Sequence, residues 1–257
     1  MLDVFHVTKR YGKTVACADV SFHLDPGSVT VLLGPNGAGK STIMKAIIGF
    51  LRYEGEITVD GLPSKTEAAR RRLGYIPELP SLYPNLTVSE HMEFLARAYR
   101  LTERGGAGVT DFQGQPTEYQ TRIAALFDRF ELTEQRGKFG DELSKGMQQK
   151  LNLCLGLLPD PDVCLLDEPM IGLDPHAIKE LKRMIEEMRG LGKTLLISTH
   201  IIDSVDMRWD RAMIMQNGEI RANLTREELG ERTLEDVFFT VTEGLERDSM
   251  REGGPEA

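Results

Sequence analysis

The segment Gly-Pro-Asn-Gly-Ala-Gly-Lys-Ser at residues 34–41 matches the pattern G-x-x-x-x-G-K-[ST] at every fixed position. A short apolar run at 29–33 precedes it, and a helix-forming run at 42–48 follows it. A strand, a glycine-rich turn and a helix in this order direct consecutive backbone N–H groups and the positive end of a helix toward one point. The pattern therefore predicts an α/β fold with a phosphate-binding loop, and a nucleoside triphosphate as its ligand.

Each part of this loop has an expected role toward a triphosphate. The glycines allow the backbone to curl around phosphate oxygens. We expect Lys40 to reach the β- and γ-phosphates and the Ser41 hydroxyl to ligate Mg²⁺. The alternative is a glycine-rich turn that only precedes a helix. The candidate nucleotide-binding residues of this segment are Gly34, Pro35, Asn36, Gly37, Ala38, Gly39, Lys40, Ser41 and Thr42.

The composition narrows the class of protein. The 257 residues are 40% hydrophobic and 28% charged, which is ordinary for a globular chain with one α/β domain or a core with a smaller subdomain. The net charge of −9 argues against a surface that coats nucleic acid. No apolar run reaches the ~18 residues needed to span a bilayer. The N-terminus lacks a secretory signal pattern, so we expect a cytoplasmic protein.

Cysteine usage indicates neither a disulfide framework nor a metal site. Cys17, Cys154 and Cys164 form no C-x-x-C pair, and Cys164 lies within a strongly apolar run. We expect all three to be reduced, structural thiols.

Hydrophobic patterning predicts a mostly parallel sheet. The run at 176–190 repeats apolar residues at spacings of three and four, which indicates a helix, and a strand-like run at 194–198 follows it. This strand–helix alternation favours a parallel α/β sheet. We also expect an antiparallel β element at the N-terminus. Strand-like runs lie at 2–8, 19–24, 29–33, 56–59, 73–76, 163–166, 194–198, 211–216 and 219–222.

The middle of the chain differs from both ends. From about 87 to 157 we find no convincing strand, and helical patterns lie at 88–100, 118–130 and 146–158. We therefore expect a helical subdomain inserted into the α/β core. The glycine-rich stretch 105–116 predicts a mobile surface loop, and the charged tail from 244 onward predicts a frayed end.

These patterns predict three parts. The nucleotide-binding core would comprise residues 1–79 and 158–222, and the helical subdomain residues 80–157. A C-terminal tail would comprise residues 223–257.

Two acids follow the apolar run at 163–166. At the end of a strand beside a phosphate loop, Asp167 is placed to hold Mg²⁺. Glu168 is one residue further and can orient or deprotonate the water that attacks the γ-phosphate. The alternative is the solvated acidic end of an ordinary strand.

A further motif, Leu-Ser-Lys-Gly-Met-Gln-Gln-Lys at 143–150, opens the last helix of the middle region. With the phosphate loop and the two acids, it gives an order of motifs that resembles the nucleotide-binding subunit of an ATP-binding-cassette (ABC) transporter, over about residues 2–222. Residues 144–148, which we name the signature segment, are similar to the family's signature motif. The resemblance implies that Ser144, Gly146 and Gln148 contact an ATP held by the opposite subunit. An ordinary helix N-cap is the alternative for Ser144.

The resemblance extends to three further positions. His200, after the strand at 194–198, resembles the switch histidine that donates to the γ-phosphate. Asp174, in the segment 171–174, belongs to a loop similar to the one that links the two ATP sites. Tyr11 resembles the aromatic residue that stacks on adenine, although an isolated tyrosine also serves for packing. The candidate catalytic residues are Lys40, Glu168 and His200.

The sequence departs from the family pattern in two places. Glu78 stands where family members usually carry glutamine; it can still ligate Mg²⁺ or accept from water, but it cannot donate an amide hydrogen bond. Lys145 and Met147 replace the commonest glycine and glutamine of the signature motif. This version, like residues 235–238 in the tail, is similar to the exporter-type branch, whose permease is a separate chain. A plain amphipathic helix remains the alternative for 233–241.

The resemblance implies an ATPase whose two copies, identical or related, close head to tail around two ATP, with Mg²⁺ as a cofactor. It also implies an integral membrane permease as partner, transport in the export direction, and a place on the inner face of the cell membrane. The permease would dock near residues 78–88, where apolar side chains could instead pack inside the subdomain: Leu79, Leu82, Tyr83 and Leu86. A soluble ABC-type ATPase acting on nucleic acid or ribosomes is the rival class; the net charge and the single cassette argue against it, so no nucleic-acid partner is expected.

Overall fold

The computed structural model describes residues 1–103, 109–202 and 207–242. The strands are β1 (Leu2–Tyr11), β2 (Thr14–Leu24), β3 (Val29–Leu33), β4 (Glu54–Val59), β5 (Leu62–Pro63), β6 (Leu73–Ile76), β7 (Val109–Thr110), β8 (Pro116–Thr117), β9 (Val163–Asp167), β10 (Thr194–Thr199), β11 (Arg211–Gln216) and β12 (Glu219–Thr225). The helices are α1 (Lys40–Ile47), α2 (Glu67–Arg70), α3 (Val88–Ala98), α4 (Tyr119–Arg129), α5 (Lys145–Leu157), α6 (Pro175–Gly190) and α7 (Arg226–Leu229). Residues 234–242 are also helical.

The central sheet explains why the apolar runs are continuous. Its strand order is β12-β11-β3-β10-β9-β6, and β3, β9 and β10 are buried along their whole length. All neighbouring pairs are parallel except β11 with β12. Strands covered on both faces need apolar residues at every position rather than alternating ones.

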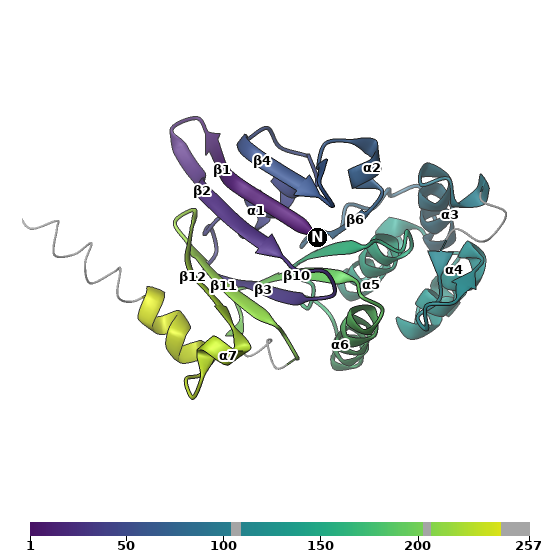
Figure 1. Cartoon of the computed structure of the whole chain (residues 1–257). Helices are drawn as coiled ribbons and strands as arrows, with labels where there is room; N and C mark the ends of the chain where they lie inside the picture. The colour runs from purple at the N-terminus through teal and green to yellow at the C-terminus, as the bar shows by residue number, and fades with distance from the viewer. Residues whose placement is uncertain (104–108, 203–206, 243–257) are drawn as a thin grey trace, which may run out of the picture.

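Alternate residues of the central strands enter two separate cores. Val31 and Ile197 belong to the core that includes α5 and α6, whereas Leu32 and Leu196 belong to the core that includes α1. A second sheet, of order β2-β1-β4-β5, closes the α1 core from the other side, and its pairs are antiparallel. Figure 1 shows α1 between the two sheets. The expected fold class, an α/β core with a mostly parallel sheet and an antiparallel N-terminal element, is confirmed.

The helices of the middle region gather at one end of the molecule. Figure 1 shows α3, α4 and α5 together, on the side opposite α7. Helix α3 begins with a capping box, in which Thr87 accepts from the backbone of Glu90 and the Glu90 carboxylate accepts from the backbone of Thr87. Helix α5 packs against β6 and links this end to the central sheet.

The expectation of no strand between 87 and 157 was wrong for the described residues. Of the stretch 105–116, which we expected to be a mobile surface loop, residues 105–108 lie outside the described residues. Strands β7 and β8 pair antiparallel as a short hairpin. Val109 and Phe112 are buried in the core beside α4 and α5, so hydrophobic burial anchors a stretch whose glycine content suggested mobility. The short elements β5, α2 and α7 were not predicted either. The expected frayed tail from 244 onward lies outside the described residues.

In the part of the chain that the structure describes, no helix combines the length and the apolar character needed to cross a bilayer.

Candidate functional site

The glycine-rich loop at residues 34–39 lies between the end of β3 and the start of α1. Gly39 has φ +110°, and a Cβ there would clash with the Ala16 carbonyl. A Cβ at Gly34 would clash with the carbonyl of Met215 on β11. Both positions therefore require glycine. A cleft opens beside this loop, and we name it the nucleotide cleft. Its lining residues are Ala16, Asn36, Gly37, Ala38, Gly39, Lys40, Ser41, Thr42, Glu78 and Glu168.

Lys40 is buried at the floor of this cleft. Its ammonium donates to the carbonyls of Gly34, at 2.6 Å, and Pro35, at 3.3 Å. It also lies 3.4 Å from Glu168 Oε1. A cation with only 6% of its side chain exposed needs such partners, because an unpaired buried charge is costly. The loop thus places the positive charge of Lys40 beside the carboxylate of Glu168, the second of the two acids at the carboxyl end of β9.

Asp167 is held at the carboxyl end of β9 by two hydroxyl groups. Ser198, on the adjacent strand β10, donates to Asp167 Oδ1 at 2.5 Å. Tyr75, on β6, donates to Asp167 Oδ2 at 3.2 Å. Burial and the neighbouring Asp167 charge raise the pKa of Tyr75, so its hydroxyl remains a donor at neutral pH. Asp167 is therefore fixed in position with acceptor capacity left on both oxygens.

Glu168 adopts a left-handed backbone conformation, φ +49°, which is uncommon for a residue with a side chain. Its N–H contacts the Ser198 carbonyl and hydroxyl, both at 3.2 Å. Its carboxylate accepts from the backbone N–H of His200 at 3.4 Å, and Oε1 lies 2.9 Å from His200 Nδ1. Strain of this kind clusters at functional sites. Glu168, Lys40 and His200, expected as one catalytic group, are brought together.

The oxygen donors around the cleft suit a hard cation. Ser41 and Glu78 line the cleft, and Asp167 ends the strand beside it. Hydroxyl and carboxylate oxygens are the ligands that Mg²⁺ prefers. Asn152 on α5 donates to the Pro77 carbonyl at 2.8 Å and so secures the backbone just before Glu78. These residues fit a magnesium ion.

Tyr11 lies apart from the cleft lining. It ends β1, pairs with Thr14, and leaves 49% of its surface exposed. The Lys9 ammonium lies 4.9 Å from its ring centroid. The ring is accessible, but it does not line the nucleotide cleft.

The signature segment is also separate from the cleft. Ser144 is the N-cap of α5, where its side chain accepts from the N–H of Met147 at 3.3 Å, and it is exposed. Gln148 donates to the Gly140 carbonyl at 3.0 Å and is engaged within its own region. None of Ser144, Gly146 and Gln148 lines the cleft of the same chain.

Asp174 is tied to α5 of its own chain. It caps α6 by accepting from Ala177 N at 2.9 Å, and it pairs with Lys150 at 2.7 Å. The hydrogen bonds from Lys150 and the backbone hold the pKa of Asp174 below its usual range. Lys150 also pairs with Glu131 at 3.0 Å. Burial lowers the pKa of Lys150, but the hydrogen bonds to both carboxylates outweigh this effect and leave its pKa raised.

The four apolar residues expected to contact a permease differ in exposure. Leu79 and Tyr83 are 76% and 55% exposed, whereas Leu82 packs against the core. Leu86 is half-buried. Tyr83 stacks edge-on to Phe94, which is also exposed.

Sequence reasoning missed several residues that support the site. Tyr75 and Ser198 hold Asp167 from two different strands, and Lys150 and Asn152 connect α5 to Asp174 and Pro77. The partners of Ser198 and Tyr75 follow from the register of parallel strands, which a single sequence does not specify. Lys150 and Asn152 are polar residues among the apolar residues of a buried helix. That pattern in the sequence could have indicated that both have structural partners.

Comparison with known proteins agrees with this geometry. Residues 17–171 match the family model described as ABC transporter. The ABC-type transporter ATP-binding protein EcsA of Bacillus subtilis (strain 168) is 34% identical over 251 residues, covering 94% of this chain and 96% of that protein. The chain belongs to the ABC transporter family of ATP-binding proteins.

Other relatives support the same assignment. The Nod factor export ATP-binding protein I of Rhizobium meliloti (strain 1021) is 35% identical, with 84% of this chain and 62% of that protein covered. A solved ATP-binding subunit of an ABC transporter superimposes with a TM-score of 0.82 at 33% identity, covering 94% of this chain and 99% of that one. A bacterial ABC transporter cassette solved as a dimer shares the fold, with a TM-score of 0.74 at 23% identity over 88% of this chain and 98% of its own.

Proposed function

We propose that this ABC protein binds and hydrolyses ATP as one of two subunits that close around two ATP and drive a separate membrane permease for export. One observation carries the proposal. Lys40 and Glu168 line the nucleotide cleft, whereas the signature segment, which begins with the exposed residues Ser144 and Lys145, lies outside the cleft of the same chain. A second copy placed head to tail would supply the missing donors.

In the proposed reaction, the loop N–H groups at 34–42 and the positive end of α1 bind the phosphates. Lys40 exchanges its present partners for the β- and γ-phosphates, which removes a positive charge from the side of Glu168. Glu168 then accepts a hydrogen bond or a proton from the attacking water. His200, already held beside Glu168, donates to the γ-phosphate. Tyr11 stacks on the adenine ring.

Ser41, Asp167 and Glu78 would hold Mg²⁺, whose charge would stabilise the developing negative charge on the phosphate oxygens. Glu78 accepts only, so it would contact the ion or its water ligands and not donate to phosphate. Tyr75 and Ser198 keep Asp167 oriented toward this position.

ATP would contact both copies of the chain only when the pair is closed. ATP binding would therefore shift the population from the open to the closed pair. Ser144 and the N-terminal N–H groups of α5, near Gly146, would face the γ-phosphate in the partner's cleft. Asp174, pinned by Lys150 of the same chain, would place the 171–174 loop at the interface between the two sites. The relative solved as a dimer supports this arrangement.

The membrane partner is inferred from the relatives and from one surface. The relatives include a Nod factor export ATP-binding protein, which supports export by an assembly. Leu79, Tyr83 and Phe94 form an exposed apolar surface beside Glu78, and a permease segment docked there would report on the cleft. The chain would then lie at the inner face of the cell membrane. In this chain, residues 1–79 and 158–222 would form the nucleotide-binding core. Residues 80–157 would be the moving helical part, and residues 223–257 the tail.

The test is isolation of the tagged chain from detergent-solubilised membranes of its host. We expect a multi-helix membrane protein to co-purify in stoichiometric amount, and ATP hydrolysis by the complex to disappear in the Glu168→Gln variant. Ribosomal proteins or nucleic acid in its place would overturn the transporter assignment. The Leu79→Ser variant should lower recovery of the partner without lowering ATP binding.

A further inference from the structure

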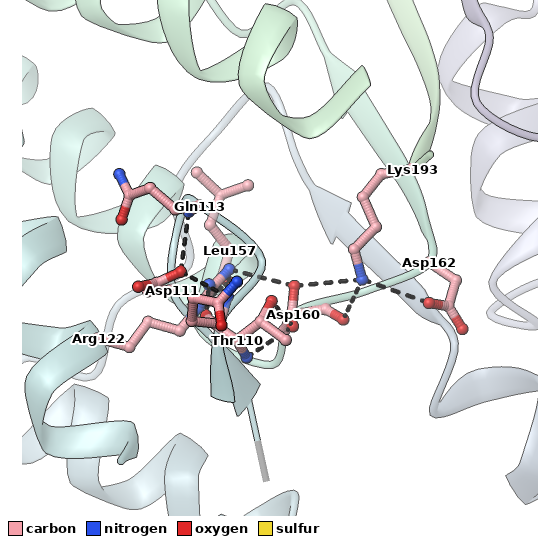
Figure 2. Close-up of polar contacts among 9 residues, drawn as sticks. Thr110, Asp111, Gln113, Arg122, Leu157, Asp160, Asp162 and Lys193 are labelled. Atoms are coloured by element: carbon pink, nitrogen blue, oxygen red, sulfur yellow. Dashed lines mark hydrogen bonds and ion pairs between the residues drawn. The ribbon is translucent and has the colours of Figure 1, made fainter. Parts of the chain in front are cut away.

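A polar cluster outside the nucleotide cleft joins the hairpin β7–β8 to the central sheet (Figure 2). We name it the Asp160 cluster; its members are Thr110, Arg122, Asp160, Asp162 and Lys193. Asp160 lies between α5 and β9, in a left-handed conformation with φ +57°. Figure 2 shows its carboxylate between Arg122 and Thr110 on one side and Lys193 on the other.

The first half of the cluster belongs to the helical end of the molecule. Thr110 donates to Asp160 Oδ2 from both its backbone N–H, at 2.9 Å, and its hydroxyl, at 2.7 Å. Arg122 on α4 lies 3.5 Å from Asp160 Oδ1. The same guanidinium donates to the Leu157 carbonyl at the end of α5 and to the Thr110 carbonyl. Asp160 therefore gathers the hairpin, α4 and α5 at one point.

The second half belongs to the central sheet. Lys193 immediately precedes β10, and its ammonium lies 3.2 Å from Asp160 Oδ1 and 3.3 Å from Asp162 Oδ1. Asp162 immediately precedes β9, and its carbonyl accepts from the N–H of Thr194. The cluster thus sits at the starts of the two strands whose carboxyl ends carry Asp167 and Ser198.

A second set of contacts joins the hairpin to α6. The ring of Phe112 lies between two guanidinium groups, 4.6 Å from Arg122 and 4.2 Å from Arg129. Arg129 pairs with Glu187 at 2.7 Å and Glu180 at 3.3 Å, both on α6. These contacts place a cation–π stack and two ion pairs between the helical end and the core.

The charges in this cluster depend on one another. Arg122 leaves only 3% of its side chain exposed, and burial lowers its pKa while Asp160 opposes that effect. Burial would raise the pKa of Asp160, but the Arg122 charge and the Thr110 hydrogen bonds outweigh it and hold that pKa below its usual range. Removing one partner would leave an uncompensated buried charge, so the cluster resists being opened.

We propose that Asp160 is a positioning residue, and that the Asp160 cluster with Phe112 braces the helical end against the core so that the signature segment is presented at a set angle. The brace is remote from the chemistry: β9 separates Asp162, just before its start, from Asp167, at its end, and from Val163 to Asp167 it spans about 13 Å at about 3.3 Å per residue. It therefore acts through orientation and not through contact with nucleotide. The activity part of this inference rests on the proposed function.

The test compares Asp160→Asn and Lys193→Met with the wild type. Asparagine tolerates the left-handed backbone of residue 160, so the first variant removes the charge and keeps the turn. Arg221→Gln, which breaks an exposed ion pair on β12, is the matched control. Spin labels at exposed positions, Lys138→Cys on the helical end and Glu56→Cys on the antiparallel sheet, report the distance between the two parts; the native cysteines are buried.

We expect a broader or shifted distance distribution in both brace variants, ATP-dependent dimerisation weakened about 5-fold or more, and unchanged ATP affinity of the single chain. Arg221→Gln should match the wild type in every readout. An unchanged distance distribution in a folded Asp160→Asn or Lys193→Met protein would overturn the brace, even if dimerisation weakened. A wild type that binds ATP and never dimerises would contradict the proposed function. The distance measurement would still test whether the Asp160 cluster fixes the helical end, because it does not require a dimer.

Discussion

The nucleotide cleft and the signature segment differ in how much of their chemistry one chain completes. In and beside the cleft, Lys40, Asp167 and Glu168 are each buried and each held by contacts within the chain. In the signature segment, Ser144 is exposed and caps the first turn of its own helix. Strand ends can preorganise charges before a ligand arrives, whereas a helix N-terminus on the surface offers donors to whatever docks there. Under the proposed function, the first region serves the reaction and the second serves a partner.

Glu168→Gln is expected to have the largest effect on the cleft. The amide cannot accept a proton, so turnover should fall about 10²- to 10⁴-fold while ATP affinity changes little. Steady-state phosphate release and equilibrium nucleotide binding measure the two effects. Turnover at the wild-type rate would remove Glu168 from the reaction and leave the cleft a binding site only.

The signature segment is tested by Ser144→Arg. A long cation at the exposed N-cap would obstruct the partner's cleft, so ATP-dependent dimerisation should weaken on the order of 100-fold. Ser144→Ala is the control, because it removes only the cap and should cost about 1 kcal/mol of folding free energy. Sedimentation with ATP measures dimerisation. Equal dimerisation of Ser144→Arg and wild type would mean that the segment does not face a partner.

Preorganisation of the cleft is tested by Gly34→Ala. The new Cβ would meet the carbonyl of Met215, so we expect a loss of roughly 1–3 kcal/mol of unfolding free energy and weaker ATP binding. Gly137→Ala is the matched control, since a Cβ there meets nothing within 4 Å and its backbone is not left-handed. Denaturant unfolding of both variants provides the comparison. Equal stability would show that the loop is not closely packed against β11.

The Asp160 cluster, which joins the helical end to the central sheet, should make the free energy of unfolding depend on pH. The pKa of Asp160 is lower in the folded chain than the ~3.9 of an unfolded aspartate, so its stabilisation is fully present above about pH 4 and is lost as the pH falls through the folded value. At neutral pH, Asp160→Asn should cost roughly 3–5 kcal/mol, because it removes one partner of a buried charged pair. The difference in unfolding free energy from wild type should shrink in acid; a difference independent of pH would contradict an ionised Asp160.

Local patterns predicted the cleft better than they predicted its supports. Residues 34–41 and the acids after 163–166 are contiguous, so their chemistry and their strand–loop–helix context are both visible in the sequence. Tyr75 and Ser198 reach Asp167 across neighbouring strands, and their contacts depend on strand order and register. The hairpin at 109–117 escaped notice because several glycines outweighed the two apolar residues, Val109 and Phe112, that anchor it. The helix starts at 88, 119 and 145 were predicted within two residues. The patterns of α3 and α4 are long and amphipathic, and α5 begins within a contiguous motif.

Under the proposed function, ATP joins two protein faces. Sedimentation of the Glu168→Gln variant tests this joining most directly, because slow hydrolysis preserves the ATP-bound state. We predict a monomer without nucleotide and a dimer with ATP, and a monomer again when Ser144→Arg is added. A chain that binds ATP stoichiometrically and stays monomeric at every protein concentration would contradict the account.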